Sequence, residues 1–130
     1  MTMATETANL IEALRTRGMP KRWVERKLAV AALGVVAAIE EGSMSPAEGG
    51  EELFNVANYR AIKHRRLDAK VREIFEWGME LEDVAELAPE SLPLSYAAIR
   101  ELASGLLRLR PPVRRGGAGS RRAAGGRAAA

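Results

Sequence analysis

The sequence predicts an all-α fold, a compact bundle of about five or six helices with a disordered basic C-terminal tail. Apolar residues recur at helical spacing along most of the chain, and we find no segment that alternates polar and apolar residues between turn signals. Apolar residues make up 47% and charged residues 28% of 130 residues, as in one soluble globular domain. We therefore expect a helical domain over residues 1–110 and a Gly/Ala/Arg tail over residues 111–130.

A first helix is expected before Gly18, and a longer second helix after it. Pro20 marks the start of the second helix, because the first helical position tolerates a missing N–H, and Gly42 can supply a left-handed cap after Glu41. We expect this segment to form the central helix. Its apolar positions at helical spacing are Val24, Leu28, Ala31, Ala32, Val35 and Ile39, widened by Leu33 and Val36.

The uninterrupted apolar run in that helix, Leu28 to Ile39, is 12 residues long. Crossing a bilayer takes about 20 apolar residues, so the run predicts a buried core helix without membrane association. The N-terminal residues lack a basic region followed by an apolar run and do not resemble a secretory signal. We therefore expect a cytoplasmic location.

Ser45, Pro46 and Glu48 form the clearest local signal. A Ser at the N-cap, a Pro at the first helical position and a Glu three residues after the Ser make a capping box, in which both side chains bind backbone N–H groups. Two glycines follow, and each costs up to about 1 kcal/mol of helix propensity. We therefore expect a short helix that ends near Phe54 or Asn55.

Four further helices follow in the sequence. They are expected over about residues 56–66, over residues 69–78 with Asp68 as the N-cap and Gly78 as the stop, over residues 81–88, and over residues 93–109. In the third of these we expect an apolar side of Leu81, Val84, Ala85 and Leu87. In the last we expect an inward stripe of Leu94, Ala98, Ile99, Leu102, Leu106 and Leu109.

Charge is segregated along the chain. Residues 108–130 hold seven of the 20 basic residues and no acidic one, which leaves 13 basic against 17 acidic residues elsewhere, a net charge of −4. Within the expected domain, one segment is basic and the next is acidic. The basic segment contains Arg60, Lys63, His64, Arg65, Arg66, Lys70 and Arg72 against Asp68. The acidic segment contains Glu73, Glu76, Glu80, Glu82, Asp83, Glu86 and Glu90, and no base.

The composition argues against an enzyme. The chain has no Cys and one His, which excludes thiolate chemistry and leaves no histidine cluster for a metal. Asp83 and Glu86 lie one turn apart, as an acid–base pair can, but carboxylates on an exposed acidic helix are usually inert. Gly116 to Gly119 lacks the lysine of a phosphate-binding loop. We therefore expect no catalytic, cofactor or metal site.

The function that we expect is a non-enzymatic protein-interaction or regulatory module. One form of it is an immunity-type protein that masks a partner with the acidic segment. The alternative is a nucleic-acid-associated protein that uses the basic segment of residues 60–72 and the Arg-rich tail. A further alternative that the sequence leaves undecided is self-association into a homo-oligomer. Trp23 and Trp77 each lie beside a charged segment, where they could anchor a partner or close the edge of the core.

One set of residues between Leu28 and Leu107 forms a recognisable pattern: Leu33, Gly34, Ala38, Ile39, Glu40, Gly42 to Ser45, Glu48, Leu53, Phe54, Trp77 to Val84, Leu87, Pro89 and Glu90. In this pattern the segment resembles a family of small helical bacterial proteins of unknown function. The run Gly78 to Asp83 is the less generic part. The resemblance implies a bacterial, cytosolic, helical domain and assigns no site residue.

Overall fold

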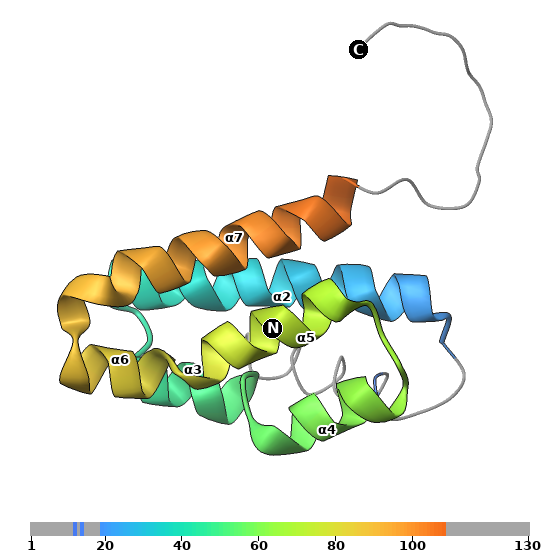
Figure 1. Ribbon diagram of the computed structural model, residues 1–130, viewed down its shortest axis with the longest axis horizontal. Coiled ribbons are helices and arrows are strands. Elements are labelled where there is room, and N and C mark those ends of the chain that lie inside the picture. Colours follow the sequence, from blue (N-terminus) through green and yellow to red (C-terminus); the bar gives the residue numbers. More distant parts are fainter. Residues whose placement is uncertain (1–11, 13, 15–18, 109–130) are drawn as a thin grey trace, which may run out of the picture.

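The computed structural model describes residues 12, 14 and 19–108, and these residues form an all-helical bundle without strands (Figure 1). The expected first helix and the expected disordered tail lie outside the described residues, except that Glu12 and Leu14 are helical. The described helices are α2 (Lys21–Glu41), α3 (Pro46–Glu52), α4 (Val56–His64), α5 (Ala69–Met79), α6 (Leu81–Leu87), the 3-10 helix η1 (Pro89–Ser91) and α7 (Leu92–Arg108). The predicted fold class is confirmed.

Helices α2 and α7 lie side by side and run in opposite directions (Figure 1). Near one end of the pair, Arg26 Nη1 donates a hydrogen bond to the Leu107 carbonyl oxygen over 3.0 Å. Towards the other end, Arg100 forms an ion pair with Glu40. Helix α7 packs against α5, α6 and η1 as well as against α2. The prediction that the last helix lies alongside α2 is confirmed, whereas α7, and not α2, has the largest share of the contacts between helices.

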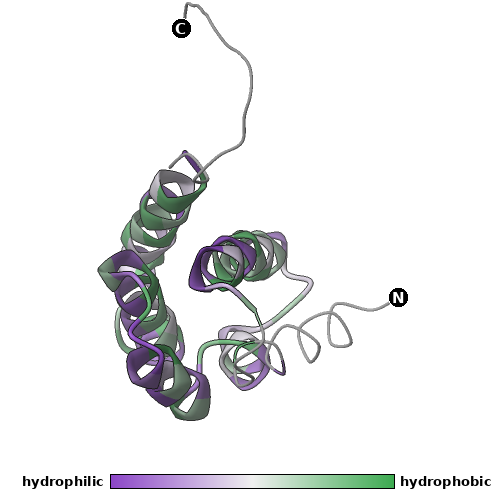
Figure 2. Ribbon diagram, turned by 90° about the vertical axis from the view of Figure 1, so that its right-hand side faces the viewer, coloured by the Kyte–Doolittle hydropathy of each residue, from purple (hydrophilic) through white to green (hydrophobic). Residues whose placement is uncertain are grey.

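The core is aliphatic, with few aromatic rings. Each helix combines hydrophobic and hydrophilic residues (Figure 2), as amphipathic helices do around a shared core. In α2 the buried residues are Val24, Leu28, Ala29, Ala32, Val35, Val36 and Ile39, close to the predicted stripe. Ala31 and Leu33 are only partly buried. Leu14 is fully buried in the same core.

The helix signals around α3 are confirmed. Ser45 Oγ accepts a hydrogen bond from the Glu48 N–H over 3.1 Å, and Glu48 Oε1 accepts one from the Ser45 N–H over 2.8 Å. Gly42 caps α2 with a φ of 84°, in the left-handed region that favours glycine. Helix α3 ends at Glu52, earlier than predicted, because Leu53 leaves the helical region at φ −135°.

Three other helix ends differ from the predicted positions. Pro20 is the N-cap of α2 and not its first residue, because its ψ of 144° is extended. Helix α4 ends at His64, since Arg66 has a φ of 56° and cannot continue a right-handed helix. Gly78 does not stop α5, which continues through it to Met79.

The inward face of α7 agrees with the predicted one at Ile99 and Leu106 and differs from it at Leu94, while Leu109 lies outside the described residues. Leu94 is 71% exposed, and the buried residues are Ser95, Tyr96, Ile99, Ala103 and Leu106. The face is set by contact with both α2 and α5, and Leu94 lies about 140° round the helix from Ile99. In α6 only Leu81 is buried, whereas Leu87 is 81% exposed, so the predicted apolar side of that helix is wrong at Leu87.

Candidate docking cleft

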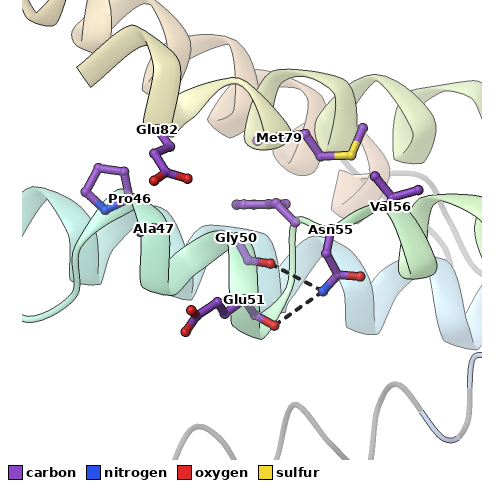
Figure 3. A pocket seen from close by; sticks show the side chains of 10 residues that line it. Pro46, Ala47, Gly50, Glu51, Asn55, Val56, Met79 and Glu82 are labelled. Atoms are coloured by element: carbon purple, nitrogen blue, oxygen red, sulfur yellow. Dashed lines mark hydrogen bonds between the residues drawn. The ribbon is translucent and has the colours of Figure 1, made fainter. Parts of the chain in front are cut away.

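A cleft of about 400 Å³ opens between α3, the start of α4 and the junction of α5 with α6 (Figure 3). Its lining is formed by Pro46, Ala47, Gly50, Glu51, Phe54, Asn55, Val56, Gly78, Met79 and Glu82. Ligand pockets span about 300–1,000 Å³, so this cleft is at the small end of that range. The size suits one or two side chains of a partner.

The floor of the cleft is apolar and closely packed. Phe54 is buried and packs edge-on against Phe75, with ring centroids 5.3 Å apart at an interplanar angle of 81°. The Phe54 ring lies against the backbone of Gly78, where a Cβ atom would come within 2.3 Å of Phe54 Cγ. The absence of a side chain at Gly78 therefore allows the loop after α3 to pack against α5.

Two asparagines stabilise the turn between α3 and α4, which forms one wall of the cleft. Asn55 Nδ2 donates to the carbonyl oxygens of Gly50 and Glu51, each over 3.3 Å (Figure 3). Asn55 Oδ1 accepts the Asn58 N–H over 2.9 Å and so caps α4. Buried Asn58 donates from Nδ2 to the Leu53 carbonyl oxygen over 2.9 Å. These bonds fix the turn that carries Phe54.

Helices α3 and α6 pack against each other and make one end of the molecule acidic. Together they contain six carboxylates and no basic residue: Glu48, Glu51 and Glu52 on α3, and Glu82, Asp83 and Glu86 on α6. We call this pair of helices the acidic end. Figure 3 shows the Glu82 side chain extending from α6 towards Pro46 and Ala47 of α3. The Glu52 Oε1 atom is shielded from solvent and has no hydrogen-bond partner among the described residues.

The acidic segment predicted from the sequence, residues 73–90, overlaps the acidic end only in part. Its members are exposed, but Glu76 on α5 is engaged, because its Oε2 accepts a hydrogen bond from the Tyr59 hydroxyl over 2.6 Å. This hydrogen bond, aided by burial and by the charge of Glu76, raises the pKa of Tyr59 above its ordinary value of 10.0, while Arg72 acts to lower it. Sequence reasoning predicted α3 as a helix but did not place its three Glu residues on the same surface as α6.

In the structure, the basic residues predicted over residues 60–72 include one with a structural role and several that are exposed. Arg65 has a structural role, because its guanidinium donates to the carbonyl oxygens of Leu14 and Met19 over 3.2 and 2.9 Å. Exposed basic side chains remain in the second half of α4 and directly after it, with Lys63 and His64 in its last turn. They are Arg60, Lys63, His64 and Arg66. Cations at a helix C-terminus also complement the helix dipole, so their position has a local explanation.

Exposed apolar side chains flank the acidic end. Leu87 is the last residue of α6, and Leu94 lies in the first turn of α7, just beyond η1.

The two tryptophans are partly exposed. Trp23 and Trp77 are 37% and 38% exposed, and Lys27 Nζ lies 5.6 Å from the Trp23 ring centroid. Both rings are therefore partly sheltered and partly accessible.

In the part of the chain that the structure describes, no group of three or more His, Asp or Glu residues could hold a metal ion. Among the same residues, none of the helices is both long enough and apolar enough to cross a membrane.

Fold and cleft together define a small all-helical domain with an acidic end and an apolar-floored cleft. A family model described as "Protein of unknown function (DUF3969)" matches residues 19–115, and the chain belongs to this family. The match confirms the resemblance found in the sequence. No curated protein and no solved structure matches the chain.

Proposed function

We propose that this protein is a non-enzymatic protein-interaction module that binds a cationic surface of another protein through its acidic end. The observation that carries the proposal is the packing of α3 beside α6, which brings six carboxylates and no base to one end of the molecule. Two of them, Glu51 and Glu82, line the apolar-floored cleft. Complementary charge speeds encounter and selects partners. We further propose that it acts in the cytoplasm of a bacterium, where it could mask its partner as an immunity-type protein does.

Apolar side chains next to the carboxylates support the proposal. Protein interfaces combine an apolar centre with a polar rim, and charge alone gives selectivity more than affinity. Val56 in the cleft lining is 55% exposed, and Leu87 at the end of α6 is 81% exposed. The acidic end therefore offers both apolar contact area and a charged rim.

The test combines capture with charge reversal. A tagged full-length chain is used to retain partners from the native host after nuclease treatment, and the retained protein is then purified for calorimetric titration. Glu82→Lys with Glu86→Lys should weaken binding at least about tenfold, which corresponds to about 1.4 kcal/mol.

The matched control is Glu12→Lys with Glu101→Lys, which makes the same change of net charge at exposed positions outside α3 and α6. This variant should retain most of the affinity. Equal affinity of both variants and the unchanged chain would show that the acidic end is not the binding surface.

A second candidate is nucleic-acid association, favoured by the exposed cluster of Arg60, Lys63, His64 and Arg66 and by the arginines after residue 108. Binding through phosphates falls steeply with salt, in proportion to the number of phosphates neutralised. Removal of residues 111–130 should abolish a steep salt dependence if the tail is the binder. Absence of binding to nucleic acid at low salt would count against this candidate.

A further inference from the structure

The cleft has the chemistry to receive an arginine side chain. Its lining offers the half-buried Met79 to an aliphatic stem, while Glu82 stands at the rim to pair with a guanidinium. Arginine combines an apolar stem with a charged head that can bind a carboxylate through two N–H groups. None of the ten described lining residues is basic, so an incoming cation would meet no repulsion from the lining.

The chain itself contains a segment of complementary charge. Residues 109–130 hold six arginines and no acidic residue, namely Arg110, Arg114, Arg115, Arg121, Arg122 and Arg127. This segment follows α7, whose end lies beside the basic first turns of α2, since Arg26 binds the Leu107 carbonyl oxygen. Lys21 and Lys27 are in the same part of α2. Like charges there disfavour local contact, and the acidic end lies towards the opposite end of α7 (Figure 1).

The length of the segment is sufficient to reach the cleft. Helix α7 has 17 residues and is about 25 Å long at about 1.5 Å per residue. An extended chain covers about 3.3 Å per residue, so Arg121 and Arg122 can be up to about 45 Å from Arg108. Tethering also raises the effective concentration of the segment at the cleft, to the millimolar range for short flexible linkers.

We propose that the Arg-rich segment of residues 109–130 docks in the acidic cleft of its own chain, with an arginine stem on Met79 and its guanidinium paired with Glu82. This inference rests on the proposed function, because a segment bound there competes with the cationic partner. The Arg-rich segment therefore regulates access to the acidic end, and a partner must displace it.

The test uses paramagnetic broadening in the full-length chain. The sequence has no Cys, so Ser120→Cys introduces a single site for a spin label next to Arg121. Backbone amide signals of Gly50, Val56 and Met79 should lose intensity relative to the same sample with the label reduced. The loss should disappear at high salt, which screens ion pairs.

Two variants decide whether the cleft is the binding site. Glu82→Lys should restore the amide intensities, whereas Glu101→Lys, an exposed reversal on α7, should leave the broadening in place. Circular dichroism confirms that both variants are folded. Absence of broadening in the unchanged chain, or broadening that survives Glu82→Lys, would overturn the proposal.

The source of the docked segment is tested by mixing. An isotope-labelled chain without a spin label is combined with an unlabelled chain that carries the spin label. Broadening in this mixture would overturn docking within one chain and assign the cleft to the segment of a second copy. Loss of the tail contact alone leaves partner binding by the acidic end intact, so the two proposals fail separately.

Discussion

The ring of Phe54 lies against the backbone of Gly78, so closely that a Cβ at residue 78 would stand 2.3 Å from Phe54 Cγ. Carbon atoms in contact are ordinarily about 3.5–4.0 Å apart, so no side chain fits at this position without movement of the ring. Phe54 is itself held by its edge-on contact with Phe75. The contact between the Phe54 ring and the Gly78 backbone joins the turn after α3 to α5 and forms the floor of the cleft.

Gly78→Ala should therefore destabilise the protein by about 1–3 kcal/mol, the usual cost of overpacking, although alanine is the better helix former. Urea denaturation measures the difference. Gly50→Ala is the matched control, because a Cβ there meets nothing within 4 Å, and it should stabilise the protein by up to about 1 kcal/mol. A Gly78→Ala protein as stable as the Gly50→Ala protein would contradict the close contact.

Arg65→Ala should cost about 2 kcal/mol of stability, because it removes hydrogen bonds from a charged group to the carbonyl oxygens of Leu14 and Met19. Arg65→Lys should recover little of the loss, since an ammonium lacks the planar fork that serves two acceptors. Thermal or urea unfolding provides the measurement. Arg60→Ala, at an exposed position on α4, should change stability by less than about 0.5 kcal/mol.

The Tyr59 hydroxyl should titrate above its ordinary pKa of 10.0, chiefly because of its hydrogen bond to Glu76. Since the folded pKa is the higher one, this bond stabilises the fold fully below the unfolded pKa, and its contribution is lost as pH rises through the folded pKa. Ultraviolet absorbance titration in a Tyr96→Phe background isolates Tyr59, because burial also raises the pKa of Tyr96. Glu76→Ala should lower the Tyr59 pKa towards 10.0, and an unchanged pKa would contradict the assignment.

Leu87→Ala with Leu94→Ala should leave stability within about 0.5 kcal/mol, since both side chains are largely exposed. The same double variant should weaken binding of the partner, because it removes apolar area beside the acidic end. Leu81→Ala provides the contrast. Leu81 is fully buried, and its truncation should cost about 2–5 kcal/mol in urea denaturation. Undiminished partner affinity would remove Leu87 and Leu94 from the interface.

Local signals in the sequence predicted the helices well where a side chain caps the backbone N–H groups of the same helical turn. Ser45 and Glu48 make their capping box from residues three apart, and Asp68 caps α5 by accepting the Lys70 N–H over 2.8 Å. Such contacts depend on neighbours in the chain and need no tertiary information. The wide apolar stripe of α2 also indicated that this helix contributes a large part of the core.

Other features depended on which helices meet. Leu94 fits an apolar stripe in the sequence but is exposed, because α7 turns a different face to α2 and α5. Gly78 was predicted to stop a helix and instead receives the Phe54 ring. Arg65 was predicted as part of a basic segment and instead binds backbone carbonyls far away in the sequence. None of these partners lies within a few turns of the residue it contacts.

The sequence by itself determined the all-helical class, most helix boundaries to within a few residues and the acidity of residues 73–90, because periodicity, caps and charge are local properties of the chain. Only the tertiary structure decided that α3 packs beside α6, that six carboxylates share one end of the molecule, and that an apolar-floored cleft lies there. The physical reason is that a helix face acquires its role from what it packs against.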